Sequence, residues 1–230
     1  MVDLKQNTHV LLLDMNNTFM FGEDRFGSDQ NYYEYYYKVV GALPESQLQD
    51  VIESAYNYLL VRYPDEKYRD NFPSLETALS SVSNKKLDAE ELEKIIDTFS
   101  YHEHGHIPPE YASILTALGD QYTLAAVIDI WSPKQRWLRT FELLGLDKVF
   151  SAYSFSSDHG SVKPSPVGFN LVVDELSIPK ENCLVVGDSL RRDLGGAVAA
   201  GIDCVLVGGE ESSDAIASYP TLLDLAKDLL

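Results

Sequence analysis

The chain has 230 residues, of which 45% are hydrophobic and 23% are charged, proportions that are usual in folded globular proteins and exclude a largely disordered chain. Its 18 basic and 36 acidic residues give a formal net charge of −18, so the protein repels nucleic acids and anionic membranes. We therefore exclude both as partners and expect any anionic ligand to be held by local positive charge or by a metal ion.

The sequence contains no pattern typical of export or membrane insertion. The N-terminal stretch MVDLKQNTHVLLLD has too short an apolar run and too early an acidic residue for a signal peptide. No later run approaches the ~20 apolar residues of a membrane-spanning helix. Cys183 and Cys204 each lie in an apolar run, where we expect buried, reduced thiols; a disulfide or a metal pair is the alternative. These features predict a cytoplasmic protein.

The first predicted strand covers residues 9–14, HVLLLD, and ends on Asp14. After it, residues 19–107 contain no apolar run of the kind that buried strands produce, but they contain several amphipathic helical patterns. We therefore predict an all-helical cap domain over residues 19–107. Because it is inserted directly after the first strand, this cap is expected to lie over that strand's end.

Two segments of the predicted cap have an unusual composition. The stretch YYEYYY, residues 32–37, is typical of packing within a cap helix, and the lining of a ligand pocket is the alternative. The stretch HEHGH, residues 102–106, resembles a metal cluster in composition, but no second group of ligands accompanies it. We expect a hinge or an exposed loop there rather than a zinc site.

The remaining chain alternates between predicted strands and helices. Further buried strands are predicted over residues 122–129, 182–188 and 203–208. Ser132 and Pro133 are typical of a helix start and follow the first of these strands. This alternation predicts an α/β fold with a doubly wound parallel sheet. We assign residues 1–18 and 108–230 to this core domain.

Charged side chains fall at or just after the predicted strand ends and in one loop. They are Asp14, Asp129, Lys163, Asp188 and Asp193. The carboxyl ends of parallel strands meet at one edge of a sheet, so we expect these side chains to converge. An aspartate there could attack a phosphoryl group with the help of a hard cation, and a lysine could neutralise that group. Taken singly, Asp14 is also typical of a turn and Asp188 of a helix start.

The segments LLLDMNNT, VKPSP and VVGDSLRRDLGGAVAAG, in this order, resemble the first, third and fourth motifs of the haloacid dehalogenase (HAD) superfamily of hydrolases. The resemblance covers nearly the whole chain and is strongest to phosphatase-like members that carry a helical cap after the first motif. The segment VVGDSLRRDLGGAVAAG, which resembles the fourth motif, is the most specific of the three. The resemblance implies a Rossmann-like core and a Mg²⁺-dependent phosphatase that acts on a small phosphorylated metabolite.

The resemblance also implies a role for each matching residue. Asp14 matches the nucleophile, which forms an aspartyl-phosphate and binds Mg²⁺. Position 16 matches a residue that binds the metal through its backbone carbonyl and acts as general acid and base. Lys163 matches the lysine that holds the nucleophile and the phosphate. Asp188 and Asp193 match the acids that complete the metal site, and Thr18 is expected to contact the substrate.

Two positions depart from the family pattern. Asn16 stands where family phosphatases carry a second aspartate, and an amide cannot transfer the proton that this position handles. Ile128 and Asp129 stand where the second motif places a hydroxyl residue, usually followed by Asn, that binds the phosphoryl oxygens. General acid–base catalysis is commonly worth ~10²- to 10⁴-fold in rate, so the sequence predicts weakened turnover. Asp129 could compensate for the missing hydroxyl, or it could brace the following loop.

Three functions therefore stay open from the sequence. The first is a phosphatase of reduced activity, acting as a monomer or a homodimer. The second is a catalytically silent relative that binds a ligand or a partner protein through the same cleft. The third, dehalogenation, needs only the nucleophilic aspartate, but the metal-binding pattern GDSLRRD, residues 187–193, argues against it.

Overall fold

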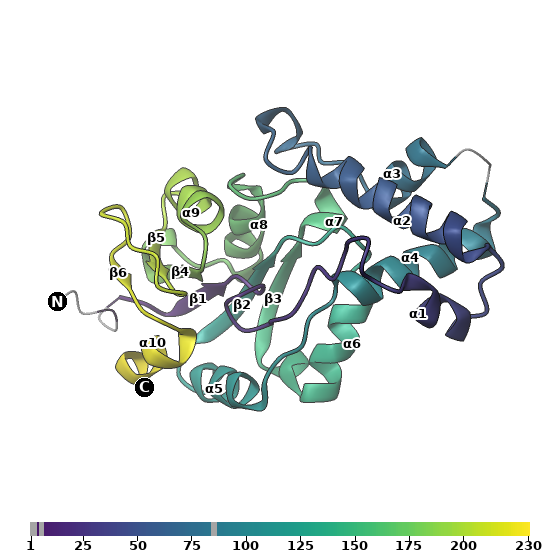
Figure 1. Ribbon diagram of the computed structural model, residues 1–230. Coiled ribbons are helices and arrows are strands. Elements are labelled where there is room, and N and C mark those ends of the chain that lie inside the picture. The colour runs from purple at the N-terminus through teal and green to yellow at the C-terminus, as the bar shows by residue number, and fades with distance from the viewer. Residues whose placement is uncertain (1–3, 5–6, 84–86) are drawn as a thin grey trace.

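The computed structural model describes residue 4 and residues 7–83 and 87–230. Its centre is a six-stranded sheet with the strand order β3-β2-β1-β4-β5-β6, in which every neighbouring pair is parallel (Figure 1). The strands are β1 Val10–Leu13, β2 Thr123–Ile128, β3 Phe150–Phe155, β4 Cys183–Gly187, β5 Asp203–Leu206 and β6 Ala217–Ser218. This sheet confirms the predicted α/β class with a parallel sheet.

The four strands predicted from apolar runs correspond to β1, β2, β4 and β5, while β3 and β6 were not predicted. Strand β3 has the sequence FSAYSF, in which serines and a tyrosine interrupt the apolar pattern. It forms one edge of the sheet, where one residue is exposed and another half-buried. Strand β6 is only two residues long, too short for any periodic signal.

Side chains alternate between the two faces of the sheet, so each face builds its own hydrophobic layer. Leu11 and Leu13 of β1 join the layer covered by α5 Pro109–Gly119, α6 Gln135–Leu144 and α10 Leu222–Leu229. Val10 and Leu12 join the opposite layer, covered by α8 Val167–Leu176 and α9 Gly195–Ala200. Figure 1 shows these helices on the two sides of the sheet, which is therefore doubly wound.

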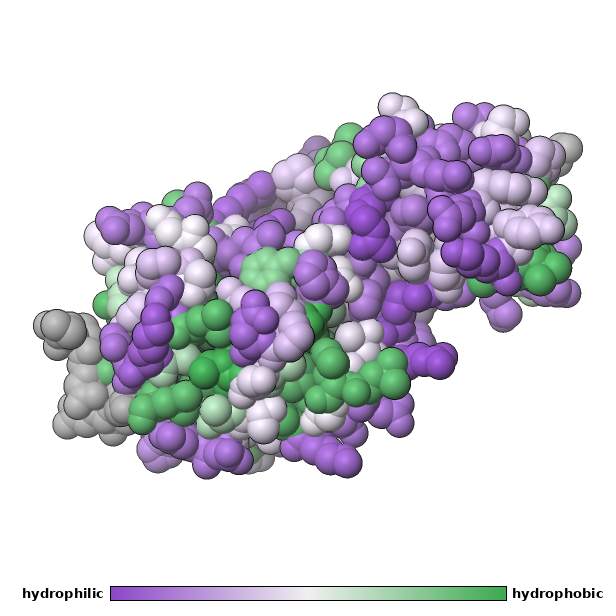
Figure 2. Space-filling model, turned by 60° about the horizontal axis from the view of Figure 1, so that its bottom comes forward, coloured by the Kyte–Doolittle hydropathy of each residue, from purple (hydrophilic) through white to green (hydrophobic). Residues whose placement is uncertain are grey.

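Shorter turns complete the core. They are α7 Ser156–His159, the 3₁₀ turns η2 Leu146–Lys148 and η3 Lys180–Asn182, and the π-helical turn η4 Leu190–Leu194. Cys183 and Cys204 are buried free thiols, as expected. Within the described ranges, no helix has both the length and the apolar character needed to cross a membrane. Figure 2 shows hydrophobic surface gathered over the side of the core that carries α5 and α10.

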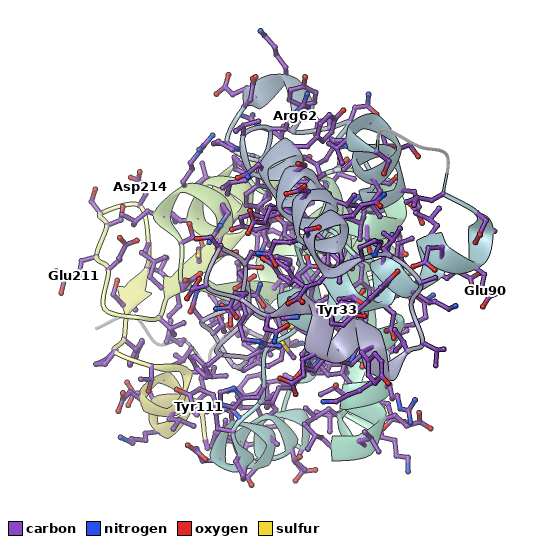
Figure 3. All side chains as sticks on the ribbon, turned by 45° about the vertical axis from the view of Figure 1, so that its right-hand side comes forward. Tyr33, Arg62, Glu90, Tyr111, Glu211 and Asp214 are labelled. Carbon is purple, nitrogen blue, oxygen red and sulfur yellow. The ribbon has the colours of Figure 1, made fainter. Side chains whose placement is uncertain are left out.

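The segment between β1 and α5 folds as a helical unit with its own hydrophobic cluster. Its helices are α1 Tyr32–Lys38, α2 Glu45–Leu60, α3 Leu75–Val82 and α4 Ala89–Glu103, with the 3₁₀ turn η1 Glu66–Tyr68. Tyr32 and Tyr36 are fully buried in this cluster, and the ring of Tyr33 on α1 (Figure 3) lies 6.2 Å from that of Tyr36. The tyrosine stretch thus serves packing. The exact domain boundary at residues 19 and 107 stays a prediction.

The two crossings between cap and core lie side by side. Phe21 and His106 exchange both of their backbone hydrogen bonds, at 2.9 and 2.8 Å. This bridge ties the start of the helical insert to its end. The chain therefore enters and leaves the cap at one hydrogen-bonded place next to the end of β1.

The layered core predicts a large effect for Leu12→Ala. Leu12 is fully buried in the central strand, so the variant loses apolar contacts and leaves a cavity. We expect the free energy of unfolding to fall by about 2 to 5 kcal/mol. Leu143→Ala is the control, because Leu143 is 77% exposed and should change stability by less than about 0.5 kcal/mol. Urea unfolding measures both, and similar values for the two variants would contradict this packing.

Candidate active site

Three carboxylates stand directly beyond the central strands of the sheet. Asp14 follows β1, Asp129 follows β2 and Asp188 follows β4. Because β1 pairs with both β2 and β4, the three strand ends lie side by side. A cavity of about 80 Å³ lies at this edge, and we term it the strand-end cavity. Its walls are formed by Asp14, Asn16, Asn17, Glu23, Asp24, Tyr63, Glu103, Asp129, Trp131, Lys163 and Arg192.

A buried lysine joins two of the aspartates. The Nζ of Lys163 donates hydrogen bonds to Oδ1 of Asp14 and to Oδ1 of Asp193, the latter over 2.7 Å. All three residues are at least 92% shielded from solvent, since their exposed fractions are 5%, 8% and 1%. Burial lowers the pKa of Lys163, but the attraction of Asp14, Asp193 and Asp129 outweighs it and raises the pKa overall. The lysine is therefore held in its charged form.

Asp14 and Asp193 are each held by a second donor. The hydroxyl of Thr18 donates to Oδ2 of Asp14 over 3.2 Å, and the backbone N–H of Ser189 donates to Oδ2 of Asp193 over 3.0 Å. Gly187 leaves room for Asp193, because a Cβ atom at Gly187 would lie 2.3 Å from the carboxylate carbon. The glycine of the GDS pattern thus allows η4 to turn its aspartate back against the strand end.

Three carboxylates gather closely enough to share a cation. One oxygen from each of Asp14, Asp188 and Asp193 lies within 4.8 Å of the others. Burial and the charge of Asp193 raise the pKa of Asp14, while Lys163 opposes this; the same two causes raise the pKa of Asp188 to about 6. A divalent cation would relieve this repulsion, and oxygen ligands suit Mg²⁺. The side-chain oxygen of Asn16 is also buried without a partner.

Ile128 and Asp129 lie on opposite sides of the strand end. Ile128 is 1% exposed and belongs to the hydrophobic layer under α6, together with Trp137 and Phe141. Asp129 instead faces the strand-end cavity. The expected substrate contact at Ile128 is therefore wrong, because successive side chains of a strand point to opposite faces. The resemblance placed the phosphate-binding hydroxyl at Ile128, but the side chain that faces the cavity is that of the next residue, Asp129.

Asp129 already has two donors. Its Oδ2 accepts a hydrogen bond from the backbone N–H of Lys163 over 2.9 Å and from the hydroxyl of Tyr63 over 2.8 Å. Tyr63 follows α2, so this second bond joins the cap to the core. Burial and the neighbouring charge of Asp129 raise the pKa of Tyr63 well above its ordinary value, so the phenol keeps its proton and donates.

Glu103, the last residue of α4, makes a second connection between cap and core. Its two carboxylate oxygens accept hydrogen bonds from the backbone N–H groups of Trp131, over 2.6 Å, and Ser132, over 3.0 Å. Burial and the nearby charge of Asp24 raise the pKa of Glu103 to about 7, although these N–H groups oppose the rise. Glu103 thereby fixes the loop that follows Asp129.

The histidine-rich stretch spans the end of α4 and the short segment after it, in which His106 is exposed and pairs with Phe21. His102 is buried in α4, with its Nδ1 3.1 Å from the carbonyl oxygen of Arg25, and His104 pairs with Thr140 over 3.0 Å. In the part of the chain that the structure describes, the three aspartates are the group that could hold a metal ion. The expected hinge or exposed loop is limited to the residues after Glu103, because α4 continues through residue 103.

Arg192 is the second cation on the cavity wall. Its guanidinium carbon lies 5.6 Å from the centre of the Tyr63 ring, and within the described ranges it takes part in no ion pair and donates no side-chain hydrogen bond. Sequence reasoning did not identify Arg192, Tyr63 or Glu103. Only Arg192 had a signal in the sequence, because it directly precedes Asp193. The positions of Tyr63 and Glu103 depend on how the cap packs against the core.

Comparison with known proteins gives consistent matches. A family model described as haloacid dehalogenase-like hydrolase matches residues 9–201. Pyrophosphatase PpaX of Halalkalibacterium halodurans is 27% identical over 195 residues, which cover 76% of this chain and 89% of that protein. Ribulose-1,5-bisphosphate 5-phosphatase of Halopiger xanaduensis is 31% identical over 120 residues, 52% of this chain and 49% of that protein.

A solved structure shows the same fold. The 2-haloacid dehalogenase from Pseudomonas syringae superposes with a TM-score of 0.64 at 18% identity, and the match covers 96% of this chain and 98% of that one. At this identity the likeness concerns the fold alone. Dehalogenase and phosphatase chemistry can therefore be told apart only by the side chains at the strand ends.

The burial of Glu103 next to Asp24 predicts a pH-dependent stability. Because the pKa of Glu103 is raised to about 7 in the folded protein, the folded protein binds this proton more tightly than the unfolded chain does. This tighter proton binding adds to the free energy of unfolding. The contribution is fully present below ~4.3, the pKa of Glu103 in the unfolded chain, and is lost as the pH rises through its pKa in the folded protein.

We therefore compare the parent with Glu103→Gln, which does not titrate. Between about pH 5 and pH 8 the parent should lose roughly 1 to 3 kcal/mol more unfolding free energy than the variant does. Urea unfolding at a series of pH values measures the difference. Parallel stability curves for the two proteins would show that Glu103 does not titrate in this range.

Proposed function

Because this chain belongs to the haloacid dehalogenase-like hydrolases, we propose that it is a Mg²⁺-dependent phosphatase that acts on a small phosphorylated metabolite. The observation that carries this proposal is the buried Lys163, bonded to Asp14 and Asp193 at the strand ends. The similarity to a pyrophosphatase and to a sugar-bisphosphate phosphatase supports the substrate class. We expect it to act in the cytoplasm as a monomer or a homodimer.

Asp14 is the nucleophile in this proposal. Lys163 and Thr18 donate to its two oxygens and so fix the orientation of the carboxylate. An Asp14 oxygen attacks phosphorus, the bond between phosphorus and the leaving-group oxygen breaks, and an aspartyl-phosphate forms. A water molecule then hydrolyses this intermediate, which releases phosphate and restores the carboxylate. Asp14, Asp188, Asp193 and the backbone carbonyl of Asn16 would hold Mg²⁺, which would supply positive charge to offset the phosphoryl group.

Asn16 sets the limit on the rate. An amide neither gives a proton to the leaving group nor takes one from the attacking water, so both protons must be exchanged with solvent. The missing general acid–base catalysis is worth ~10²- to 10⁴-fold. Good leaving groups, which need no proton, are therefore the better substrates of this site.

A second function is favoured by the same residue. If solvent cannot replace the missing acid, the chain is a catalytically silent relative that binds a phosphorylated ligand or a partner through the strand-end cavity. The close group of three aspartates argues against dehalogenation, which requires no cation. Turnover measurements separate the phosphatase from the silent relative.

The nucleophile and the missing acid can be tested with two substitutions. We expect the parent to hydrolyse p-nitrophenyl phosphate slowly with Mg²⁺, and Asp14→Asn to abolish this activity because an amide does not attack phosphorus. Asn16→Asp should raise kcat by about 10²-fold or more, with a larger gain on alkyl phosphates than on the nitrophenyl ester.

Chelation of divalent cations by EDTA should remove the activity reversibly.

The outcomes of that assay separate the candidates. Activity that survives in Asp14→Asn would rule out the proposed mechanism. Background activity in the parent, with a gain in Asn16→Asp, would identify the silent relative.

The role of Asp129 is tested by Asp129→Asn. Since the amide oxygen of asparagine can still accept from Lys163 N–H and Tyr63, we expect kcat to change by less than about tenfold if Asp129 only braces the site. Asp129→Ala removes both bonds and should reduce kcat further. Steady-state kinetics measure both variants; a loss of ~10²-fold in Asp129→Asn alone would show that the carboxylate charge takes part in the reaction.

A further inference from the structure

The strand-end cavity is poor in positive charge for a site that takes a phosphoryl group. Among the residues on its wall, the carboxylate side chains are Asp14, Glu23, Asp24, Glu103 and Asp129. The cationic side chains on the same wall are Lys163 and Arg192. A phosphate monoester carries close to two negative charges near neutral pH, so a cation on the wall that is free to contact it would add to the charge of the proposed Mg²⁺.

Lys163 is largely committed within the protein. Two of the three N–H bonds of its ammonium group are directed at Asp14 and Asp193. The charge is thereby shared between two carboxylates, and the side chain is 4% exposed. At most one N–H of Lys163 remains for a ligand.

The hydroxyl that would bind the phosphoryl oxygens is also missing. Ile128 stands at that position and points away from the cavity, whereas the next residue, Asp129, faces it and has an Oδ2 that accepts two hydrogen bonds. A carboxylate repels a phosphoryl oxygen where a hydroxyl would attract it. The site therefore lacks both a free lysine and the usual neutral donor.

Arg192 meets this need. Its backbone N–H donates to the side chain of Ser189 over 3.2 Å, which caps the start of η4. The side chain lines the strand-end cavity and also a second cavity of about 300 Å³, formed with Leu60, Tyr63, Pro64, Lys163, Ser189 and Arg191. The guanidinium group thus lies at the boundary of these two cavities, and its N–H groups remain available to a ligand.

We propose that Arg192 binds the phosphoryl oxygens of the substrate and replaces the hydroxyl that the site lacks at Ile128. A guanidinium group can donate two parallel hydrogen bonds to two phosphoryl oxygens, which a single hydroxyl cannot do. The aromatic ring of Tyr63 supports the guanidinium from the cap side. This inference rests on the proposed phosphatase function and assigns its phosphate-binding residue.

Arg191 offers a matched control. It is the neighbouring residue and carries the same charge, but it is exposed, and its guanidinium donates to the backbone carbonyl of Pro64. Arg191→Gln and Arg192→Gln therefore lower the net charge equally. Arg192→Lys keeps the charge but loses the paired donors.

The experiment measures binding of inorganic phosphate to the full chain with Mg²⁺ by isothermal titration calorimetry. We expect Arg192→Gln to weaken binding by about 10- to 100-fold, Arg192→Lys to restore part of this loss, and Arg191→Gln to change it by less than about threefold. Thermal unfolding confirms that each variant is folded. In kinetic assays of active protein, Arg192→Gln should raise KM for phosphate esters more than it lowers kcat.

Two results would overturn the assignment. The first is phosphate binding in Arg192→Gln within threefold of the parent, and the second is an equal loss in Arg191→Gln. Neither result bears on the nucleophile, which the Asp14→Asn assay tests separately. If turnover depends on Asp14 but phosphate affinity does not depend on Arg192, the proposed function stands and the role of Arg192 is rejected.

Discussion

The ammonium group of Lys163 is the interaction on which the rest of the site depends. It lies between Asp14, which follows β1, and Asp193, which is presented by η4, and so it joins segments far apart in the sequence. Water is excluded from all three groups, so each carboxylate would be strongly destabilised without the lysine. The sheet supplies the rigid strand ends. The positive charge of Lys163, shared between Asp14 and Asp193, allows these two buried carboxylates to lie close together.

The second constraint is the small space at these strand ends. Gly187 has no side chain, and this absence lets Asp193 fold back against β4. The alternation of β2 sends Ile128 into the hydrophobic layer and leaves Asp129 at the cavity. A shift of a single residue along either strand would exchange a buried apolar group with a charged one. Packing of the two hydrophobic layers therefore also fixes the register of the catalytic groups.

The parts of this arrangement that the sequence could predict are those with a local signal. Continuous apolar runs revealed β1, β2, β4 and β5, while the mixed composition of β3 hid that edge strand. The structure brings Asp14, Lys163, Asp188 and Asp193 together because the expected strand ends converge. The sequence could not decide between Ile128 and Asp129, since this depends on the residue at which β2 ends. Tyr63 and Glu103 reach the site only through the packing of α2 and α4, which no local pattern encodes.

Glu103 and Tyr63 also have a consequence for motion. Three hydrogen bonds, from Trp131 N–H, Ser132 N–H and the Tyr63 hydroxyl, cross between the helical insert and the loop that carries Asp129. Separation of the insert from this loop would break all three bonds and return the carboxylates of Glu103 and Asp129 to water. The contacts of Glu103 and Asp129 across this interface would therefore form and break together, since both depend on the same placement of the insert against the core.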